Sequence, residues 1–545
     1  MPPDSSRPPL DGFVPFPPER AARYRAAGHW AGRPLDSVLR HAAATWPDRV
    51  AVLDAAGPGG GHTYAELDEL ADRAAAAFAA LGIAPSDRVL LQLPNTARFA
   101  VALFGLLRAG AIPVLCLTGH RLAELRRFTE VSGAVGLIVA DTAAGFDHRA
   151  MARELVALAP GLRHVIVDGD PGPFTAWSAL PHGAAPRVAS DPAAPALVLV
   201  SGGTTGAPKL IPRTHDDYLY NATASARLCR LTGDDVYLVV LPAAHNFPLA
   251  CPGLLGAMTV GATTVFAADP SPEAAFAAIA RHRVTVTALV PALATLWARA
   301  CDWEPEPPKS LRLLQVGGSR LDPQDARLLR TTLTPGLQQV FGMAEGLLNF
   351  TRLDDPPDVV DHTQGRPLCA DDELRIVDAA GEPVAPGDEG ELLVRGPYTI
   401  NGYLRAERDN ERCFDPEGFY RSGDLVRLVD DGHLMVTGRV KDVICRGGET
   451  IAAADIEEPL LSHPAVCAAA AVALPDPLLG EKICAAVVFN GPAIGLAELN
   501  AYLDGRGVAA HARPDMLVEM AALPTTPVGK IDKKAIAARH LGPRT

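Results

Sequence analysis

The fold is constrained most by the stretch Ala196-Leu197-Val198-Leu199-Val200-Ser201-Gly202-Gly203-Thr204-Thr205-Gly206-Ala207-Pro208-Lys209. Its first five residues are apolar and unbroken, which is typical of a buried strand. The next nine contain three glycines, three hydroxyl side chains and one lysine. Glycines let a backbone turn tightly and bring its N–H groups close to an anion, while hydroxyls and Lys209 add donors and positive charge. The stretch therefore predicts a strand that ends in a phosphate-binding loop.

The spacing within this loop excludes one class of phosphate site. A Walker loop requires G-x-x-x-x-G-K-[ST], whereas Lys209 stands three residues beyond Gly206 and is followed by Leu210. An ordinary surface turn rich in Ser, Gly and Thr remains an alternative. The choice between a phosphate loop and such a turn depends on the rest of the chain.

Length and composition bound the class of protein. The chain has 545 residues, more than one hydrophobic core usually supports, so at least two domains are expected. The formal net charge of -13 argues against nucleic acid or an anionic membrane as a partner. The nine cysteines form no C-x-x-C pair, and Met1-Pro2-Pro3-Asp4 lacks a signal pattern. A cytoplasmic protein with reduced thiols is expected.

Short apolar strands alternate with helical stretches over much of the chain. This alternation predicts α/β layering with largely parallel sheets. Ligands of such sheets collect at the carboxyl ends of strands, where the Ser201 loop, the turn at His245 and the pair Gly317-Gly318 are expected. The predicted strands lie at 50–53, 89–93, 136–139, 164–167, 196–200, 235–241, 284–290 and 311–316, and the clearest helices at 64–81 and 99–108.

The texture changes near Glu373 to shorter strands separated by Gly, Asp and Pro turns. Beyond Lys441 follows a region of about a hundred residues, which is near the usual size of a domain. The sequence therefore predicts a large N-terminal domain of layered sheets and helices over residues 1–440, and a small C-terminal domain over 441–545.

Five stretches, in order along the chain, resemble motifs of the adenylate-forming superfamily, which includes acyl-CoA synthetases, luciferases and the adenylation domains of peptide assembly lines. They are Ser201–Lys209, Gln339–Gly346, Tyr420–Leu425, Gly438–Lys441 and Pro527–Asp532. Three further stretches resemble the stand-alone aryl-acid adenylating enzymes of siderophore pathways. These are Tyr24-Arg25-Ala26-Ala27-Gly28-His29-Trp30, His245-Asn246-Phe247-Pro248-Leu249 and Phe341–Gly346.

The resemblance implies an enzyme with two half-reactions. A carboxylate attacks the α-phosphorus of ATP to give an acyl-adenylate and pyrophosphate. A small, mobile α+β C-terminal domain then rotates about a hinge at Lys441, and a pantetheine thiol takes the acyl group. The implied cofactors are ATP and Mg²⁺. The implied partners are a small aryl acid and an aryl carrier protein with phosphopantetheine, or coenzyme A.

The same resemblance implies the catalytic and metal-binding residues. Lys530, in a turn flanked by Pro and Gly, would neutralise the charge that builds as the carboxylate meets the α-phosphate. A solvated lysine like its neighbours Lys533 and Lys534 is the alternative. Glu345 would bind Mg²⁺, a hard cation that prefers oxygen ligands. A carboxylate at the start of a helix is the alternative.

The nucleotide-binding residues are also implied by resemblance. Asp424 would accept hydrogen bonds from both ribose hydroxyls, and Arg439 would make a second ribose or phosphate contact; an Asp in a turn and a surface arginine are the alternatives. Phe341 would line the adenine pocket, or serve as a plain core aromatic. The remaining residues of this set are Ser201, Gly202, Gly203, Thr204, Thr205, Gly206, Lys209, Gly317, Gly318 and Gly342.

In the acyl pocket, resemblance implies that Asn246 bonds the ring 2-hydroxyl and carboxylate region, that Phe247 faces the ring, and that His245 stands at its edge. A structural asparagine and a packing histidine are the alternatives. Cys251 and Leu348 decide the substrate, because similar enzymes for 2,3-dihydroxybenzoate have serine and valine there. A thiol hydrogen-bonds weakly, and one extra methylene shifts selectivity by roughly 1–3 kcal/mol.

Salicylate is therefore predicted over 2,3-dihydroxybenzoate, with other ortho-substituted acids, such as 3-hydroxypicolinate or anthranilate, left open. Two competing functions also remain. An aryl-CoA ligase would share every adenylation residue and differ only in its acceptor. A nucleotide-binding scaffold without turnover is disfavoured by the joint presence of Lys530, Glu345, Asp424 and Arg439.

Overall fold

The structure is a computed structural model, in which two compact units divide the described residues. The first unit comprises 10–201, 208–373 and 394–420, and the second comprises 374–393 and 421–540. The predicted domain boundary at 440 and 441 falls between strands β22 (Leu434–Arg439) and β23 (Val443–Arg446), and the domain bounds stay a prediction. The described residues are 10–57, 61–181, 183–184, 186, 188–201, 208–304, 307–440, 442–446, 449–476, 478–506, 508, 512–526 and 529–540.

Two large sheets form the framework of the first unit, as far as its residues are described. The seven-stranded sheet has the order β11 (Leu210–Thr214), β10 (Pro195–Val200), β4 (Ile112–Leu115), β3 (Arg88–Gln92), β5 (Gly136–Ala140), β8 (His164–Asp168) and β9 (Thr175–Ala176). The nine-stranded sheet has the order β18 (Arg366–Pro367), β17 (Gly346–Phe350), β16 (Leu337–Met343), β15 (Leu313–Gly317), β14 (Val286–Leu289), β12 (Val236–Val239), β13 (Thr263–Phe266), β1 (Val50–Asp54) and β2 (His62–Thr63).

The strands of both sheets are mostly parallel, as the alternating sequence predicts. In the nine-stranded sheet β16, β15, β14, β12, β13 and β1 pair in parallel, whereas β17 and β18 at one edge and β2 at the other are antiparallel. In the seven-stranded sheet only β11, at one edge, is antiparallel among the described strands. Strands β4 and β5 are buried along their full length. A strand buried on both faces needs an unbroken apolar sequence, which is what these two strands have. The predicted α/β class with a large N-terminal part is confirmed.

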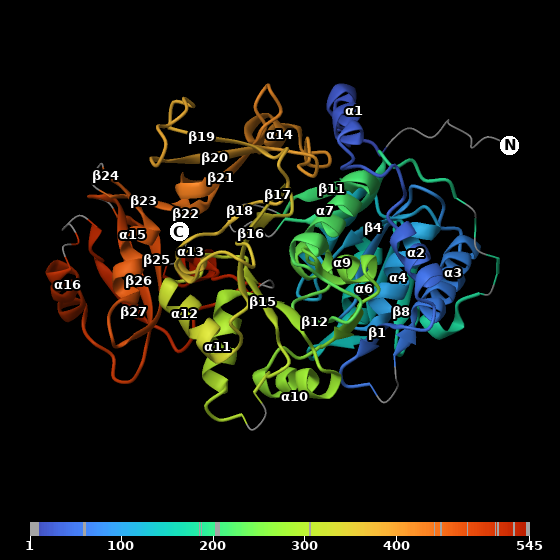
Figure 1. Ribbon diagram of the computed structural model, residues 1–545, viewed down its shortest axis with the longest axis horizontal. Helices are drawn as coiled ribbons and strands as arrows, with labels where there is room; N and C mark the ends of the chain where they lie inside the picture. Colours follow the sequence, from blue (N-terminus) through green and yellow to red (C-terminus); the bar gives the residue numbers. More distant parts are fainter. Residues whose placement is uncertain are drawn as a thin grey trace. The chain divides into compact units, whose positions relative to one another are not determined.

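Helices fill the space between the two sheets. Helix α4 (Ala97–Arg108) packs against strands of both sheets, and α3 (Tyr64–Ala80) lies along it, side by side in Figure 1. The two helices approach so closely that a Cβ on Gly105 would lie 2.6 Å from the Cβ of Ala74. A helix enclosed in this way is mostly apolar, as α4 is: its only charged residues are Arg98 and Arg108, and the buried Arg108 is paired with Asp68 and Asp72. Helices α7 (His215–Leu228), α8 (Asn246–Ala250) and α9 (Gly253–Thr259) continue this inner layer.

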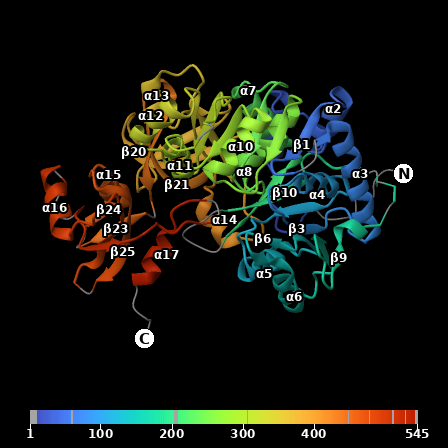
Figure 2. The ribbon, with the colours of Figure 1, turned by 90° about the horizontal axis from the view of Figure 1, so that it is seen from below.

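Other helices cover the outer faces of the sheets. The view from below (Figure 2) separates α5 and α6 from α3 and α4, with β3 between the two pairs. Apolar residues of α10, α11 and α12 join the core of the nine-stranded sheet. The bounds of the remaining elements of this unit are α1 (Pro18–Ala26), α2 (Ser37–Thr45), α5 (Leu122–Ser132), α6 (His148–Leu158), α10 (Pro272–His282), α11 (Pro291–Ala300), α12 (Pro323–Thr332), α13 (Pro357–His362), α14 (Glu407–Cys413), η1 (Trp177–Ala179), β6 (Thr142–Ala143) and β7 (Phe146–Asp147).

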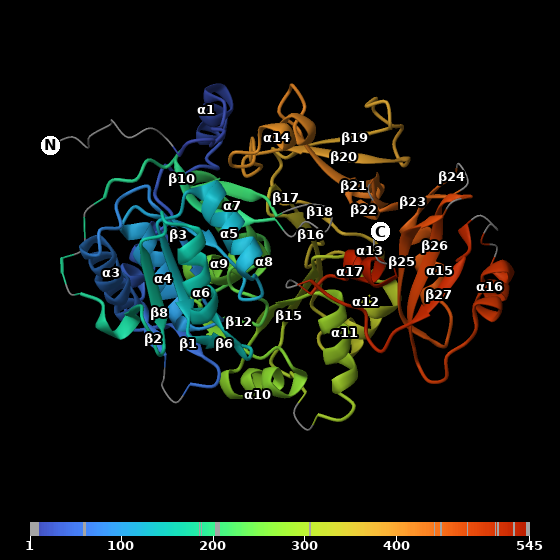
Figure 3. The same ribbon diagram turned by 180° about the vertical axis from the view of Figure 1, so that it is seen from behind.

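The second unit has an α+β organisation. A five-stranded sheet pairs β24 (Glu449–Ala452), β23, β26 (Gly480–Phe489), β25 (Val466–Asp476) and β27 (Met516–Glu519), and α15 (Ala453–Leu461), α16 (Leu496–Gly505) and α17 (Lys533–His540) pack beside it (Figure 3). A four-stranded sheet joins β19 (Glu373–Val377), β20 (Glu389–Arg395), β21 (Tyr420–Leu428) and β22, with the short helix η2 (Asp430–Gly432) between the last two strands. None of the described helices has both the length and the apolar character needed to cross a bilayer.

A partly buried ion cluster fixes the start of α17, directly after the segment that holds Lys530. The Nζ of Lys533 lies 2.6 Å from Oδ2 of Asp442 and 2.7 Å from Oε1 of Glu457. Burial raises the pKa of Glu457, and the charge of Lys533 opposes that rise. Lys533 is therefore bound to two carboxylates, whereas Lys534 is exposed.

We expect Lys533→Met to destabilise the second unit. Removing the ammonium leaves the two carboxylates of Asp442 and Glu457 together without a positive charge. Because the cluster is only partly exposed, the loss in the free energy of unfolding should fall between the values for exposed and buried pairs, about 1–3 kcal/mol. Amide hydrogen exchange of α15 and α17 in rising urea measures it, because all five tryptophans lie in the first unit. The control Lys534→Met should leave the midpoint unchanged, and equal midpoints for the two variants would contradict the role given to the cluster.

Candidate active site

The strand hairpin β16–β17 carries Glu345 in its turn. Met343 pairs with Gly346 across this turn, so Glu345 lies in a hairpin and not at the start of a helix. The hydroxyl of Tyr403 donates a hydrogen bond to Oε1 of Glu345 at 2.8 Å and lies 3.0 Å from the hydroxyl of Tyr420. Burial and the Glu345 charge raise the pKa of Tyr403 far above its usual value, so this phenol stays protonated and keeps Glu345 oriented.

The hairpin turn is also held from the seven-stranded sheet. Arg213 of β11 is fully buried; its Nη1 donates to the carbonyl of Ala344 at 2.9 Å and its Nη2 to the carbonyl of Tyr398 at 3.0 Å. Its Nε donates to Asp217 at 2.8 Å. Neither Arg213 nor Tyr403 is predicted from the sequence, because the contacts that join them to the hairpin come from partners far away in the chain. A charged residue at the end of an apolar strand was the only local signal for Arg213.

The ends of the predicted phosphate loop meet in a narrow neck. Val200 pairs with Leu210 in the antiparallel ladder of β10 and β11, and Ser201 Oγ accepts a hydrogen bond from the Lys209 amide at 2.9 Å. The Nζ of Lys209 lies 3.3 Å from Oδ1 of Asp409 and 4.5 Å from the centre of the Tyr403 ring. Lys209 and Glu345 thus contact the same tyrosine. The predicted Gly202, Gly203, Thr204, Thr205 and Gly206 lie outside the described residues.

Four of the five predicted acyl-pocket residues, all except Leu348, lie in α8 or at its ends. The Asn246 side chain is buried: its Oδ1 accepts from the Tyr218 hydroxyl at 2.8 Å, and its Nδ2 donates to Sγ of Cys251 at 3.4 Å. The thiol of Cys251 in turn donates to the Asn246 carbonyl at 3.4 Å. Burial raises the pKa of Cys251 to about 12, so the sulfur remains a neutral thiol. His245 caps α8, since its Nδ1 accepts from the Phe247 amide at 3.2 Å.

Glycines let the neighbouring strands approach these side chains. A Cβ on Gly317 would lie 2.4 Å from the Val340 carbonyl oxygen and 3.3 Å from the ring of Phe247. A Cβ on Gly342 would lie 2.4 Å from Cδ2 of Leu348, its partner across the hairpin. Both positions thus require glycine. Gly318 has a φ of +92°, which favours glycine, and Phe341 is half-buried and pairs with Asn349.

Three predicted residues lie together in the second unit. Asp424 and Arg439 face each other on β21 and β22, with Nε of Arg439 2.7 Å from Oδ1 of Asp424. Burial raises the pKa of Asp424, and the positive charges of Arg439 and Lys530 oppose that rise. A buried carboxylate beside two cations can stay ionised and accept hydrogen bonds. The predicted hinge residue Lys441 lies outside the described residues.

The donor set of the first unit suits a metal that phosphate helps to bind. Among the described residues, no three His, Cys, Asp or Glu side chains converge on a possible metal position. Glu345 offers a carboxylate that Tyr403 orients. Mg²⁺ is commonly bound by one or two carboxylates together with substrate phosphates, so the residues fit Mg²⁺ carried by a nucleotide and do not form a closed metal site.

Two families of known proteins match the chain. The family described as AMP-binding enzyme matches residues 39–404, and the family described as AMP-binding enzyme C-terminal domain matches residues 455–530. The chain therefore belongs to the AMP-binding enzymes, and the predicted membership of the adenylate-forming superfamily is confirmed. Adenylating enzymes of this family use ATP.

Similar proteins are known over nearly the whole length. A Mycobacterium tuberculosis protein named salicyl-AMP ligase / salicyl-S-ArCP synthetase is 75% identical over 538 residues, 98% of this chain and 95% of its own. The 2,3-dihydroxybenzoate-AMP ligase of Bacillus subtilis is 46% identical over 531 residues, 97% of each chain. The apo structure of Mycobacterium smegmatis MbtA matches with 69% identity and a TM-score of 0.76, covering 97% of this chain and 99% of that one. The predicted resemblance to aryl-acid–AMP ligases is confirmed.

We expect Tyr403→Phe to weaken the use of Mg²⁺ without unfolding the protein. Without the phenol hydroxyl, Glu345 loses the donor that orients it, and loss of such a supporting partner raises the metal concentration needed by on the order of tenfold. Titrating Mg²⁺ into ATP-binding measurements tests this. The control Tyr502→Phe, which removes a hydroxyl bonded to the Ser462 carbonyl in the second unit, should leave the titration unchanged.

Proposed function

We propose that this chain activates salicylate with ATP to salicyl-adenylate and then transfers the salicyl group to the phosphopantetheine thiol of an aryl carrier protein. The observation that carries the choice of acid is the hydrogen bonding of Cys251. Its single S–H donates to the Asn246 carbonyl, and its sulfur, a weak acceptor, already accepts from the side-chain amides of Asn246 and Asn221, so the thiol offers little to a 3-hydroxyl on the ring. The 75% identity to a protein named salicyl-AMP ligase / salicyl-S-ArCP synthetase supports the same reaction.

In this proposal Asn246 recognises the acid. Its amide has two N–H donors, of which one is directed to Cys251, and its oxygen is occupied by Tyr218. The second N–H is available for the 2-hydroxyl and carboxylate region of salicylate. Phe247 provides an apolar face for the ring, and Leu348 fills the space that a 3-substituent would need.

The remaining residues act on the nucleotide. Asp424 accepts hydrogen bonds from the ribose, with Arg439 beside it, and Lys209 contacts the phosphates. Lys530 neutralises the charge that grows on the α-phosphate oxygens as the carboxylate oxygen attacks and pyrophosphate leaves. Mg²⁺ held by Glu345 would neutralise the charge of the phosphate oxygens.

A coenzyme A ligase is the second candidate, because free coenzyme A carries the same thiol. Supplying the adenylating enzyme with coenzyme A in one reaction and a phosphopantetheinylated aryl carrier protein in another separates the two functions.

A cytoplasmic location is also proposed. Among the described residues no cysteine forms a disulfide, which fits a reducing compartment.

Lys530→Ala should abolish adenylation while sparing nucleotide binding. Removing a group that stabilises transition-state charge costs about a hundred- to a thousandfold in rate. Salicylate-dependent exchange of pyrophosphate into ATP measures adenylation, and calorimetry measures ATP binding. The matched control Lys534→Ala should exchange at the wild-type rate. Undiminished exchange by Lys530→Ala would refute its catalytic role.

Cys251→Ser should raise the activity with 2,3-dihydroxybenzoate relative to salicylate. A hydroxyl is a better donor and acceptor than a thiol, so the ratio of the two kcat/KM values should shift by roughly tenfold or more. Exchange assays with both acids measure the ratio. Cys116→Ser is the control, because this buried thiol likewise donates to a backbone carbonyl, that of Val114, but lies directly after β4 of the seven-stranded sheet. If the wild-type enzyme itself prefers 2,3-dihydroxybenzoate to salicylate, the proposed substrate is wrong.

A further inference from the structure

The N-terminal segment, residues 10–35 and here called the strap, contains a motif to which no role has yet been given. The motif Tyr24-Arg25-Ala26-Ala27-Gly28-His29-Trp30 resembles that of aryl-acid enzymes, and the sequence places it far from every predicted site residue. In the structure it forms the end of α1 and the turn that follows. Tyr24 and Trp30 are almost completely buried, so the strap is packed into the first unit.

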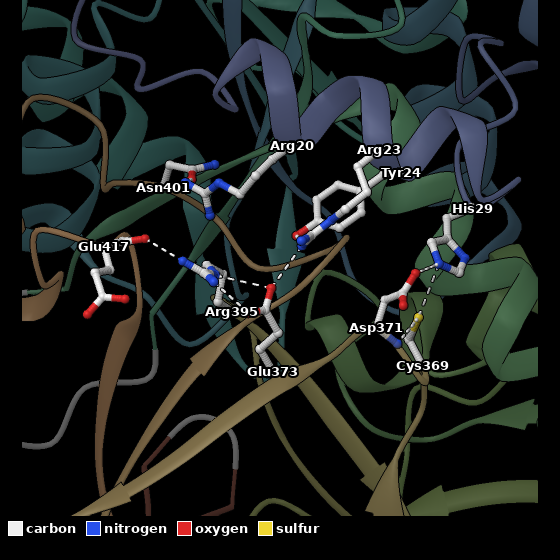
Figure 4. Close-up of polar contacts among 10 residues, drawn as sticks. All are labelled: Arg20, Arg23, Tyr24, His29, Cys369, Asp371, Glu373, Arg395, Asn401 and Glu417. Atoms are coloured by element: carbon white, nitrogen blue, oxygen red, sulfur yellow. Dashed lines mark hydrogen bonds and ion pairs between the residues drawn. The ribbon is translucent and has the colours of Figure 1, made fainter. Parts of the chain in front are cut away.

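The strap is fastened to two segments that flank residues 374–393 in the sequence: the entry segment, 369–373, and the return segment, 394–401. Nε2 of His29 lies 2.6 Å from Oδ2 of Asp371, and the indole N–H of Trp30 donates to the Pro397 carbonyl at 2.8 Å. Figure 4 shows His29 directed at Asp371 and Cys369. One end of the strap thus holds both segments.

An ion cluster beside these contacts ties the two segments to each other. Nη2 of Arg23 lies 2.8 Å from Oε1 of Glu373, and Nη2 of Arg395 lies 2.5 Å from Oε2 of the same carboxylate. Arg20 donates to Oδ1 of Asn401 at 2.7 Å (Figure 4). Glu373 is the last residue of the entry segment and Arg395 is near the start of the return segment, so α1 bridges the two places where the chain leaves and re-enters the first unit.

From these segments a chain of hydrogen bonds reaches Leu348, which is proposed to line the acid pocket. Tyr398, in the return segment, donates its hydroxyl to Oδ2 of Asp372 at 2.5 Å, and the same hydroxyl accepts from the backbone amide of Leu348 at 3.2 Å. The amide of Cys369 also donates to Oδ2 of Asp372 at 3.1 Å. The Leu348 backbone is therefore held by a side-chain pair that belongs to the segments under the strap.

The return segment also supports the other end of the hairpin. The amide of Ile400 donates to the Glu345 carbonyl at 2.8 Å, and a Cβ on Gly346 would lie 2.6 Å from Oγ1 of Thr399. The return segment thus holds the hairpin of β16 and β17 at Glu345 and Gly346 as well as at Leu348. A shift of the return segment would move both residues.

The Asp372–Tyr398 pair is costly to bury and has no place in the proposed chemistry. Burial raises the pKa of Asp372 to about 7, and the hydrogen bond from Tyr398 opposes that rise. A Cβ on Gly396 would lie 2.2 Å from Oδ1 of Asp372, so the lack of a side chain there lets the return segment approach this carboxyl. A buried polar pair of this kind fixes one arrangement of the groups around it.

We propose that the strap is a positioning element for the aryl-acid pocket: through His29 and Trp30 it fixes the entry and return segments, whose Asp372 and Tyr398 hold the Leu348 backbone at the pocket wall. This inference rests on the proposed function, because it assigns the pocket to an aryl acid. A pocket that discriminates by one methylene needs its walls fixed to within a fraction of an ångström. The strap supplies that support from outside the pocket.

Trp30→Phe tests the strap, because it removes the N–H bonded to Pro397 together with part of the indole ring, and the control below loses the same volume. We expect the KM for salicylate to rise roughly three- to tenfold while the KM for ATP stays unchanged. The preference for salicylate over 2,3-dihydroxybenzoate should also narrow. The matched control is Trp297→Phe, since Trp297 is equally buried and its indole N–H donates to a proline carbonyl, that of Pro270, at 3.0 Å. The control should change only the melting temperature.

Tyr398→Phe tests the pocket end of the same chain and keeps the inference falsifiable should Trp30→Phe fail to fold. It removes the hydroxyl that joins Asp372 to Leu348 and should change the same two quantities, the salicylate KM and the acid preference, in the same direction. If both variants behave like Trp297→Phe, the strap is merely structural and the inference is overturned. If the wild-type chain gives no pyrophosphate exchange with any aryl acid, the proposed function itself fails. That failure can be told apart from failure of the strap inference, in which the wild-type chain is active and both variants keep its KM and acid preference.

Discussion

The guanidinium of Arg213 is buried where three segments of the first unit meet, and the arrangement of the predicted site depends on it. Its donors are directed to Asp217 on α7, to the Ala344 carbonyl in the hairpin turn and to the Tyr398 carbonyl in the return segment. A buried charge is tolerated only when it is paired and its donors are satisfied, and removing one partner of such a pair typically costs about 3–5 kcal/mol. The hairpin and the return segment are therefore required to close around Arg213.

This constraint explains why residues with different tasks lie on one rigid support. Glu345 lies in the turn that Arg213 holds, and Leu348 lies three residues further along the same hairpin. The return segment that accepts the second Arg213 bond also carries Tyr398 and Ile400, which hold the hairpin backbone. The proposed metal-binding carboxylate and the proposed wall of the acid pocket are thus fixed by one network, with the strap on its outer side.

The predicted residues divide between the two compact units. Lys209, Asn246, Cys251 and Glu345 belong to the first unit, whereas Asp424, Arg439 and Lys530 belong to the second. Within the second unit the ion cluster of Lys533 fixes the helix that begins directly after the segment with Lys530. In the sequence Lys530 and Lys533 look alike, but Lys533 stabilises the local fold, whereas Lys530 is proposed to act on the nucleotide.

The sequence by itself determined the superfamily, the α/β class and most inner strands, because these depend on local patterns: motifs in order, apolar runs and glycine-rich turns. The predicted strand 89–93 and helix 64–81 agree with β3 and α3 to within a residue. Only the tertiary structure decided that Cys251 donates its hydrogen to the Asn246 carbonyl, that Tyr403 bonds Glu345, and that His29 of the strap bonds Asp371 beside the Asp372–Tyr398 pair, whose tyrosine holds the Leu348 amide. The physical reason is that, apart from the Cys251 contact, these contacts join residues dozens to hundreds of positions apart. A single buried Arg, Tyr or Asp also leaves no periodic signal in the sequence around it.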